Sequence, residues 1–186
     1  MTPLLWELVA AGMGAERATW LLDGLVVHPS LMADGDPAWV PRAVLAQALG
    51  VLLLDDLLAR VPSGAAYVGE KVAGGGRVFL DHGAVRTVVG VSCGSLPPGQ
   101  ESVTRVLSAL GYEHRQTYDL ARLHMTGRSW AQADLPADIP QYFVSELDAG
   151  SFSDGFRDAA ERVLSTSRDP FGGGHASGVG EQASGP

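Results

Sequence analysis

The chain has little cysteine and no long uncharged hydrophobic run. Its single cysteine, Cys93, cannot form a disulfide within the chain, so the sequence does not point to an oxidising compartment. The most apolar stretch, AVLAQALGVLLLDDLLARV, is interrupted by Gln47 and by Asp55 and Asp56, which favours a buried amphipathic helix over a membrane span. The first residues carry Glu7 inside an apolar run and no positive charge, unlike a signal peptide. We therefore expect a cytoplasmic protein with no membrane partner.

Positive charge is scarce as well. Lys71 is the only lysine, and 13 lysines and arginines stand against 21 acidic residues, for a net charge of −8. A surface that follows nucleic-acid phosphates needs clustered cations, so no nucleic-acid partner is expected. With 186 residues, of which 46% are hydrophobic, the chain is long enough for one domain with a substantial core and short for two.

Residues 1–62 have the pattern of a helical segment. A first helix is predicted from Pro3, with Thr2 as its N-cap, because apolar residues then recur at helical spacing. A second helix is predicted over 15–25 and a third over 39–61, ended by the PSG at 62–64.

From Arg77 the apolar period changes to that of a strand, over RVFLDHGAVRTVVG. A helix follows in ESVTRVLSALG, where Val103, Val106, Leu107 and Leu110 form one stripe closed by a glycine C-cap. Three further strands are predicted in YEHRQTYDLARL, MTGRSWAQA and QYFVSEL. The order is β-α-β-β-β.

The fold class predicted is therefore α+β, with an N-terminal helical segment packed on one βαβββ module. We expect a single domain over 1–164, in which 77–148 form the module. Residues 165–186 are rich in Gly and Ser and poor in apolar side chains, so they are predicted to be a disordered tail.

Two residues of the first strand are candidates for a binding site. His82 and Arg86 share one face of that strand, about 13 Å apart at about 3.3 Å per residue. A metal at His82 and a ligand carboxylate between the metal and Arg86 could occupy this face.

In the last strand, Glu146 shares a face with Tyr142 and Val144 and needs a partner if it is buried. A metal, Arg86 or Arg128 could be that partner. A buried Arg86–Glu146 pair explains both charges without a metal, and a hydrogen-bonded structural role explains His82.

The other candidate ligands are weaker. His114 and His124 lie among polar residues and are expected to be solvated, and His175 falls in the tail. Cys93 has no evident base nearby, so a nucleophilic role is not expected.

Taken together, DHGAVRTV, VLSALGY, TYDL, MTGRSW and IPQYFVSEL, in this order, resemble the 2-oxoadipate dioxygenase/decarboxylase family, also called the 2-hydroxyglutarate synthases. That family belongs to the vicinal oxygen chelate superfamily of βαβββ modules. The resemblance covers about residues 78–148, and the preceding helices fit the helical segment of the family.

The resemblance implies a non-haem Fe(II) enzyme that holds its metal through two histidines and a carboxylate, with open positions for a 2-oxo acid and O₂. It implies that 2-oxoadipate is converted to 2-hydroxyglutarate and CO₂. By position, His82 matches the first metal histidine, and Arg86 matches the arginine that holds the substrate carboxylate. Glu146 is the candidate for a further metal ligand.

One departure from the family is large. The second histidine and the metal carboxylate of the family come from a second module, whereas this sequence turns to a Gly-rich stretch after the first. Three interpretations follow: a short or truncated member, a homodimer whose two modules build the site together, or a catalytically inactive module that binds a small acid. If Glu146 lies beside His82 a metal is favoured; if it pairs with Arg86, binding or structure alone is favoured.

Overall fold

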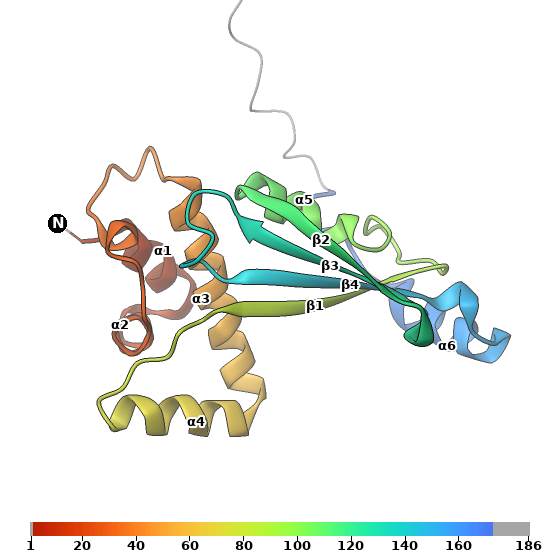
Figure 1. The fold of residues 1–186 in the computed structure, drawn as a ribbon, viewed down its shortest axis with the longest axis horizontal. Coiled ribbons are helices and arrows are strands. Elements are labelled where there is room, and N and C mark those ends of the chain that lie inside the picture. The colour runs from red at the N-terminus through yellow and green to blue at the C-terminus, as the bar shows by residue number, and fades with distance from the viewer. Residues whose placement is uncertain (1, 173–186) are drawn as a thin grey trace, which may run out of the picture.

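A computed structural model describes residues 2–172 and places a group of helices beside a four-stranded sheet (Figure 1). The helical segment comprises α1 (Leu4–Met13), α2 (Ala15–Gly24), the short helix η1 (Pro29–Met32), α3 (Arg42–Arg60) and α4 (Pro62–Ala73). The module comprises β1 (His82–Val89), α5 (Glu101–Ala109), β2 (Tyr112–Leu120), η2 (Ala121–Leu123), β3 (Met125–Gln132) and β4 (Gln141–Asp148). It is followed by η3 (Ala149–Ser151) and α6 (Asp154–Leu164). The predicted fold class, a helical segment on one βαβββ module, is confirmed.

The sheet has the strand order β1-β4-β3-β2. β1 runs parallel to β4, and the other two pairings are antiparallel. The parallel pairing requires a crossover after β1, and α5 provides it. α5 packs on one face of the sheet, where Leu107, Tyr112, Tyr142 and Val144 are buried. The stripe predicted for this helix is the side that it buries.

The helical segment and the module share one hydrophobic core, which extends from Leu5 on α1 to Val144 on β4. The long helix α3 lies across the end of the sheet (Figure 1). Gly50 makes this approach possible, because a Cβ atom there would come within 2.8 Å of Pro140 Cγ. The two parts are thus packed as closely as elements within one domain.

The third predicted helix is in fact two helices. α3 ends at Arg60, and the PSG expected to stop it opens α4, with Pro62 at its first position. Proline is favoured at the first position of a helix, so the same residue can end one helix and begin the next. β1 also begins later than predicted, at His82, because Val78 forms an isolated parallel bridge with Leu25 instead.

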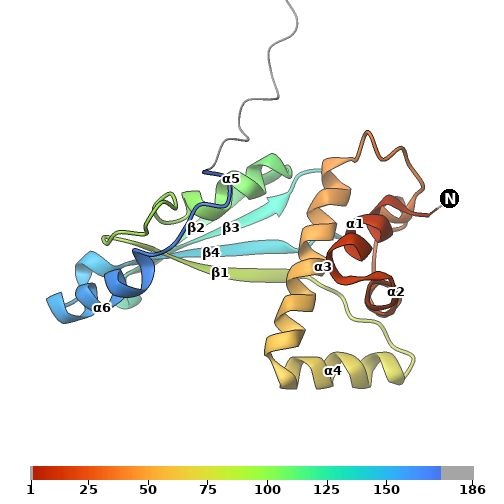
Figure 2. The same ribbon diagram turned by 180° about the vertical axis from the view of Figure 1, so that it is seen from behind.

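The chain after the module is more ordered than predicted up to residue 172. α6 was not predicted, and the segment after it turns back beside α5, as the blue end of the chain in Figure 2 shows. Arg105 on α5 holds Asp169 through two hydrogen bonds of 2.6 and 2.8 Å, and Ser95 N donates to Ser167 O at 3.1 Å. Residues 173–186, with His175, lie outside the described part.

Within residues 2–172, no helix combines the length and the apolar character that crossing a bilayer requires.

Candidate functional site

The sheet has one covered face and one open face. Neighbouring residues of paired strands share a face, so the register of β1 with β4 and of β4 with β3 defines both. The open face carries His82, Ala84, Arg86 and Val88 from β1, Phe143, Ser145 and Leu147 from β4, Gly127 and Ser129 from β3, and Tyr118 from β2. His82 and Arg86 therefore lie on one open face, as predicted.

Arg86 is held in place by the neighbouring strand. Its Nε donates to Ser145 Oγ at 2.8 Å, and Ser145 is 5% exposed. Among the described residues no carboxylate lies within ion-pair distance of Arg86. The end of the guanidinium is thus available for an anionic ligand, and a planar fork of this kind suits a carboxylate.

His82 is exposed and is oriented by its neighbour in the chain. Its Nδ1 lies 3.0 Å from Asp81 Oδ1, which also accepts from the His82 amide at 2.9 Å. The hydrogen bond from His82 lowers the pKa of Asp81, so that carboxyl is ionised and acts only as an acceptor. A neutral imidazole that donates from Nδ1 to this carboxylate presents the lone pair of Nε2 to a ligand. Carboxylates orient metal-binding histidines in the same way.

Glu146 does not join His82, so the predicted metal pair is corrected. The register places Glu146 opposite Thr87, on the face that α5 covers. Its Oε2 accepts from the amide of Gln100, at the start of α5, at 2.8 Å, and its Oε1 lies 3.6 Å from Arg128 Nη1. The carboxylate therefore satisfies a helix N-terminus, where negative charge is stabilising.

The buried Arg86–Glu146 pair is not formed either. Of the three partners considered for Glu146, the structure selects Arg128. Gly99 leaves the space for this carboxylate, because a Cβ atom at that position would come within 2.1 Å of Glu146 Oε2.

Iron needs more ligands than this face offers. Within residues 2–172 no group of three or more His, Cys, Asp or Glu side chains could hold a metal ion. His82 is one nitrogen ligand, and two histidines with a carboxylate are required for the metal centre that the resemblance implies. The described residues of one chain therefore do not fit a complete iron site.

The remaining candidate ligands contact aromatic rings or the backbone. His114 packs edge-on against Trp130 on the covered face, with Nε2 3.0 Å from Thr117 Oγ1. His124 packs against Phe152, with ring centroids 4.8 Å apart. The thiol of Cys93 lies 3.6 Å from the backbone oxygen of Val88. None of these groups is near His82 in the sheet.

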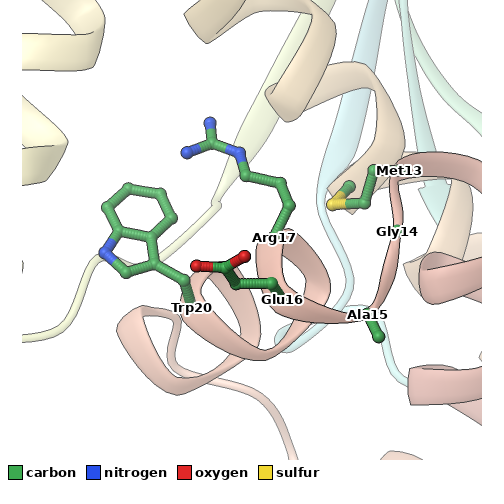
Figure 3. A pocket seen from close by; sticks show the side chains of 6 residues that line it. All are labelled: Met13, Gly14, Ala15, Glu16, Arg17 and Trp20. Carbon is green, nitrogen blue, oxygen red and sulfur yellow. The ribbon is translucent and has the colours of Figure 1, made fainter.

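Figure 3 shows a hollow at the corner between α1 and α2, of about 590 Å³. Arg17 is the one basic residue that lines it, and it already has partners. Its Nε contacts Asp55 at 2.7 Å, and its guanidinium lies 4.5 Å from the ring centroid of Trp20. The hollow is formed by one short stretch of chain, and we assign it no function.

Two residues of the site were missed at the level of sequence. Ser145 positions Arg86 from a strand 59 residues away, and only the register of β1 with β4 reveals it. Asp81 precedes His82 directly, so the pair DH was a usable signal for an oriented histidine.

No protein-family model and no curated protein matches the sequence. The structure matches that of a proposed glyoxalase-superfamily protein from Ralstonia eutropha JMP134, with a TM-score of 0.84 and 44% sequence identity. The match covers 91% of this chain and 53% of that one. The chain has a glyoxalase-superfamily fold. This superfamily is the vicinal oxygen chelate group that the motifs predicted.

The chain spans about half the length of the Ralstonia protein, since 53% of that chain is covered. A proposed hydrolase from Shewanella frigidimarina NCIMB 400 also matches, with a TM-score of 0.48, 18% identity and coverage of 72% and 47% of the two chains. That second likeness is too weak to carry any conclusion.

Proposed function

We propose that this chain contributes His82 and Arg86 to a non-haem Fe(II) site that oxidatively decarboxylates a 2-oxo acid. The observation that supports this is the arrangement of the two residues on one open face, each oriented by a polar neighbour. His82 offers a free imidazole nitrogen for the metal, and Arg86 offers a guanidinium for the carboxylate of the acid.

The substrate implied by the resemblance is 2-oxoadipate. With O₂ it gives 2-hydroxyglutarate and CO₂, so that both oxygen atoms appear in the products and no separate reductant is needed. Arg86 would bind and orient the acid through its carboxylate. A bound Fe(II) would supply the activation of O₂.

The ligands that complete the metal site are proposed to come from a second βαβββ module. A second copy of this chain is the partner we propose, because the Ralstonia protein with the same fold has a chain about twice as long as the region matched. The open face of one module would then meet that of the other.

Anaerobic Fe(II) binding, with the mass of the protein measured in solution, tests this proposal. We expect iron to bind to a dimer, and we expect His82→Ala to abolish it. His114→Ala is the matched control, because this histidine lies on the covered face beside Trp130. O₂ uptake with 2-oxoadipate is then measured on the iron-loaded dimer. Iron binding that survives His82→Ala would contradict the proposal.

A second function, binding of a small acid without redox chemistry, is favoured by one observation. Among the described residues His82 is the one histidine on the open face, and no group of three or more His, Cys, Asp or Glu side chains gathers there. Acid binding that depends on Arg86, in a protein that takes up no iron at micromolar concentrations, would select this function.

A further inference from the structure

A cleft of about 290 Å³ lies between α3 and the start of β1. Its walls are mostly apolar: Leu53, Leu54 and Leu57 from α3, and Leu80, Val85 and Tyr142 from the module. Leu53 and Leu57, one turn apart on α3, are 44% and 49% exposed and form the helix wall of this cleft. Apolar surfaces gathered in a concave site are typical of small-molecule binding.

The cleft is continuous with the open face of the sheet. His82 and Ala84 of that face line the cleft, and Val85 and Tyr142 line it from the covered face, so the cleft wraps around β1, which is an edge strand of the sheet. Arg86 is the next residue of the same face. An acid whose carboxylate is held by Arg86 can therefore extend past Ala84 and place the rest of its chain against the leucines of α3.

The charges at the rim of the cleft are already paired. Arg60, the one arginine among the residues that line it, forms an ion pair with Asp56 one turn earlier on α3. Burial raises the pKa of Tyr142 to about 12, so this side chain stays neutral. A second carboxylate on the ligand would lose water here, meet Asp56, and gain no free cation in return.

We infer that the site prefers 2-oxo acids with an apolar side chain to 2-oxo dicarboxylates. This inference rests on the proposed function, since Arg86 must hold the carboxylate next to the oxo group. It changes the expected substrate class from 2-oxoadipate to alkyl or aryl 2-oxo acids of similar length.

A matched pair of ligands tests the inference directly. 2-Oxohexanoate and 2-oxoadipate have the same number of carbon atoms and differ only in a terminal methyl group against a carboxylate. Dissociation constants are measured for both by calorimetry on the full chain, anaerobically, with and without Fe(II). We expect 2-oxohexanoate to bind at least about tenfold more tightly, the lower end of what an apolar pocket discriminates. Amide shifts in NMR spectra should change at α3 as well as at β1.

Variants of α3 sharpen the test. Leu57→Lys puts a cation into the cleft and should reverse the preference, and Asp56→Asn should improve 2-oxoadipate binding by freeing Arg60. Leu45→Lys is the matched control: Leu45 is also an exposed leucine of α3, at 36%, but does not line the cleft. It should leave both affinities unchanged.

The outcomes separate the inference from the function on which it rests. Equal binding, or tighter binding of 2-oxoadipate by the natural chain, overturns the inference and leaves the proposed function intact. Failure of both acids to bind, or binding that Arg86→Gln does not weaken, overturns the proposed function and the inference together.

Discussion

Arg86 on β1 and Ser145 on β4 are direct neighbours in the parallel pairing, and the Arg86 Nε donates to the Ser145 hydroxyl at 2.8 Å. Ser145 is buried and its Oγ lies 3.4 Å from the backbone oxygen of Val85. The hydroxyl therefore fixes the guanidinium at its inner nitrogen and leaves the outer nitrogens for a ligand. Ser145 is a positioning residue.

Ser145→Ala should weaken acid binding about tenfold, which corresponds to the loss of one hydrogen bond to a charged group. The free energy of unfolding should fall by about 1 kcal/mol. Ligand titration and urea unfolding measure the two effects. Ser129→Ala, on the same face but on β3, is the control and should leave binding unchanged. Equal losses of affinity in the two variants would show that Ser145 does not act through Arg86.

Glu146→Ala should lower stability without affecting iron uptake. The substitution leaves the Gln100 amide at the start of α5 unsatisfied and removes the partner of Arg128, which is worth about 1–3 kcal/mol of unfolding free energy. Urea unfolding and iron binding are measured side by side. Glu113→Ala, on the exposed part of β2, should change stability by less than about 0.5 kcal/mol. Loss of iron at unchanged stability would restore Glu146 as a ligand.

The contact of Asp169 with α5 should depend on pH. Hydrogen bonds from Arg105 and from the Phe171 amide lower the pKa of Asp169 from 3.8 to about 2. A carboxyl whose pKa is lower in the folded state stabilises the fold above its unfolded pKa and loses this contribution as the pH falls. The segment 165–172 should therefore detach from α5 between about pH 4 and pH 2.

Hydrogen exchange of this segment as a function of pH measures the effect. Asp169→Asn should show rapid exchange at every pH, whereas Asp158→Asn, on the exposed side of α6, should keep the transition. Exchange that does not change across this pH range would contradict the assigned role of the ion pair.

Two glycines should respond in opposite ways to the same substitution. A Cβ atom at Gly127 would lie 2.2 Å from Phe143 Cζ, so Gly127→Ala must displace the Phe143 ring, which lies on the open face. We expect a loss of about 1–3 kcal/mol of unfolding free energy. Gly69, inside α4, has no atom within 4 Å of such a Cβ, and Gly69→Ala should stabilise by about 0.5–1 kcal/mol. Thermal unfolding of both variants tests this contrast.

The sequence was sufficient for the elements of the βαβββ module and their order. Val103 and Leu107 mark the buried side of α5 at helical spacing, and the strand patterns give each strand within a few residues. Pro62 misled the prediction because proline breaks a helix from within but starts one well. α6 was missed although Ser153 at its N-cap and Phe156, Ala160 and Val163 at helical spacing were usable signals; none of its residues is buried.

The site was only partly predictable for a different reason. The alternation along one strand correctly put His82 with Arg86, and Glu146 with Tyr142. Whether these two sets lie on the same face of the sheet depends on the register between β1 and β4. The alternation within one strand does not determine that register. For the same reason the choice of Arg128 over Arg86 as the partner of Glu146 could not be made in advance.

The close packing of Gly50 against Pro140 has a consequence for how the protein unfolds. Because the helical segment and the sheet share one interior, neither can open without exposing apolar surface of the other. We therefore expect the helical segment and the sheet to unfold together in a single cooperative transition. The helical segment is therefore part of what keeps the β1 edge and its histidine in shape, and separating it from the sheet would remove one wall of the cleft as well.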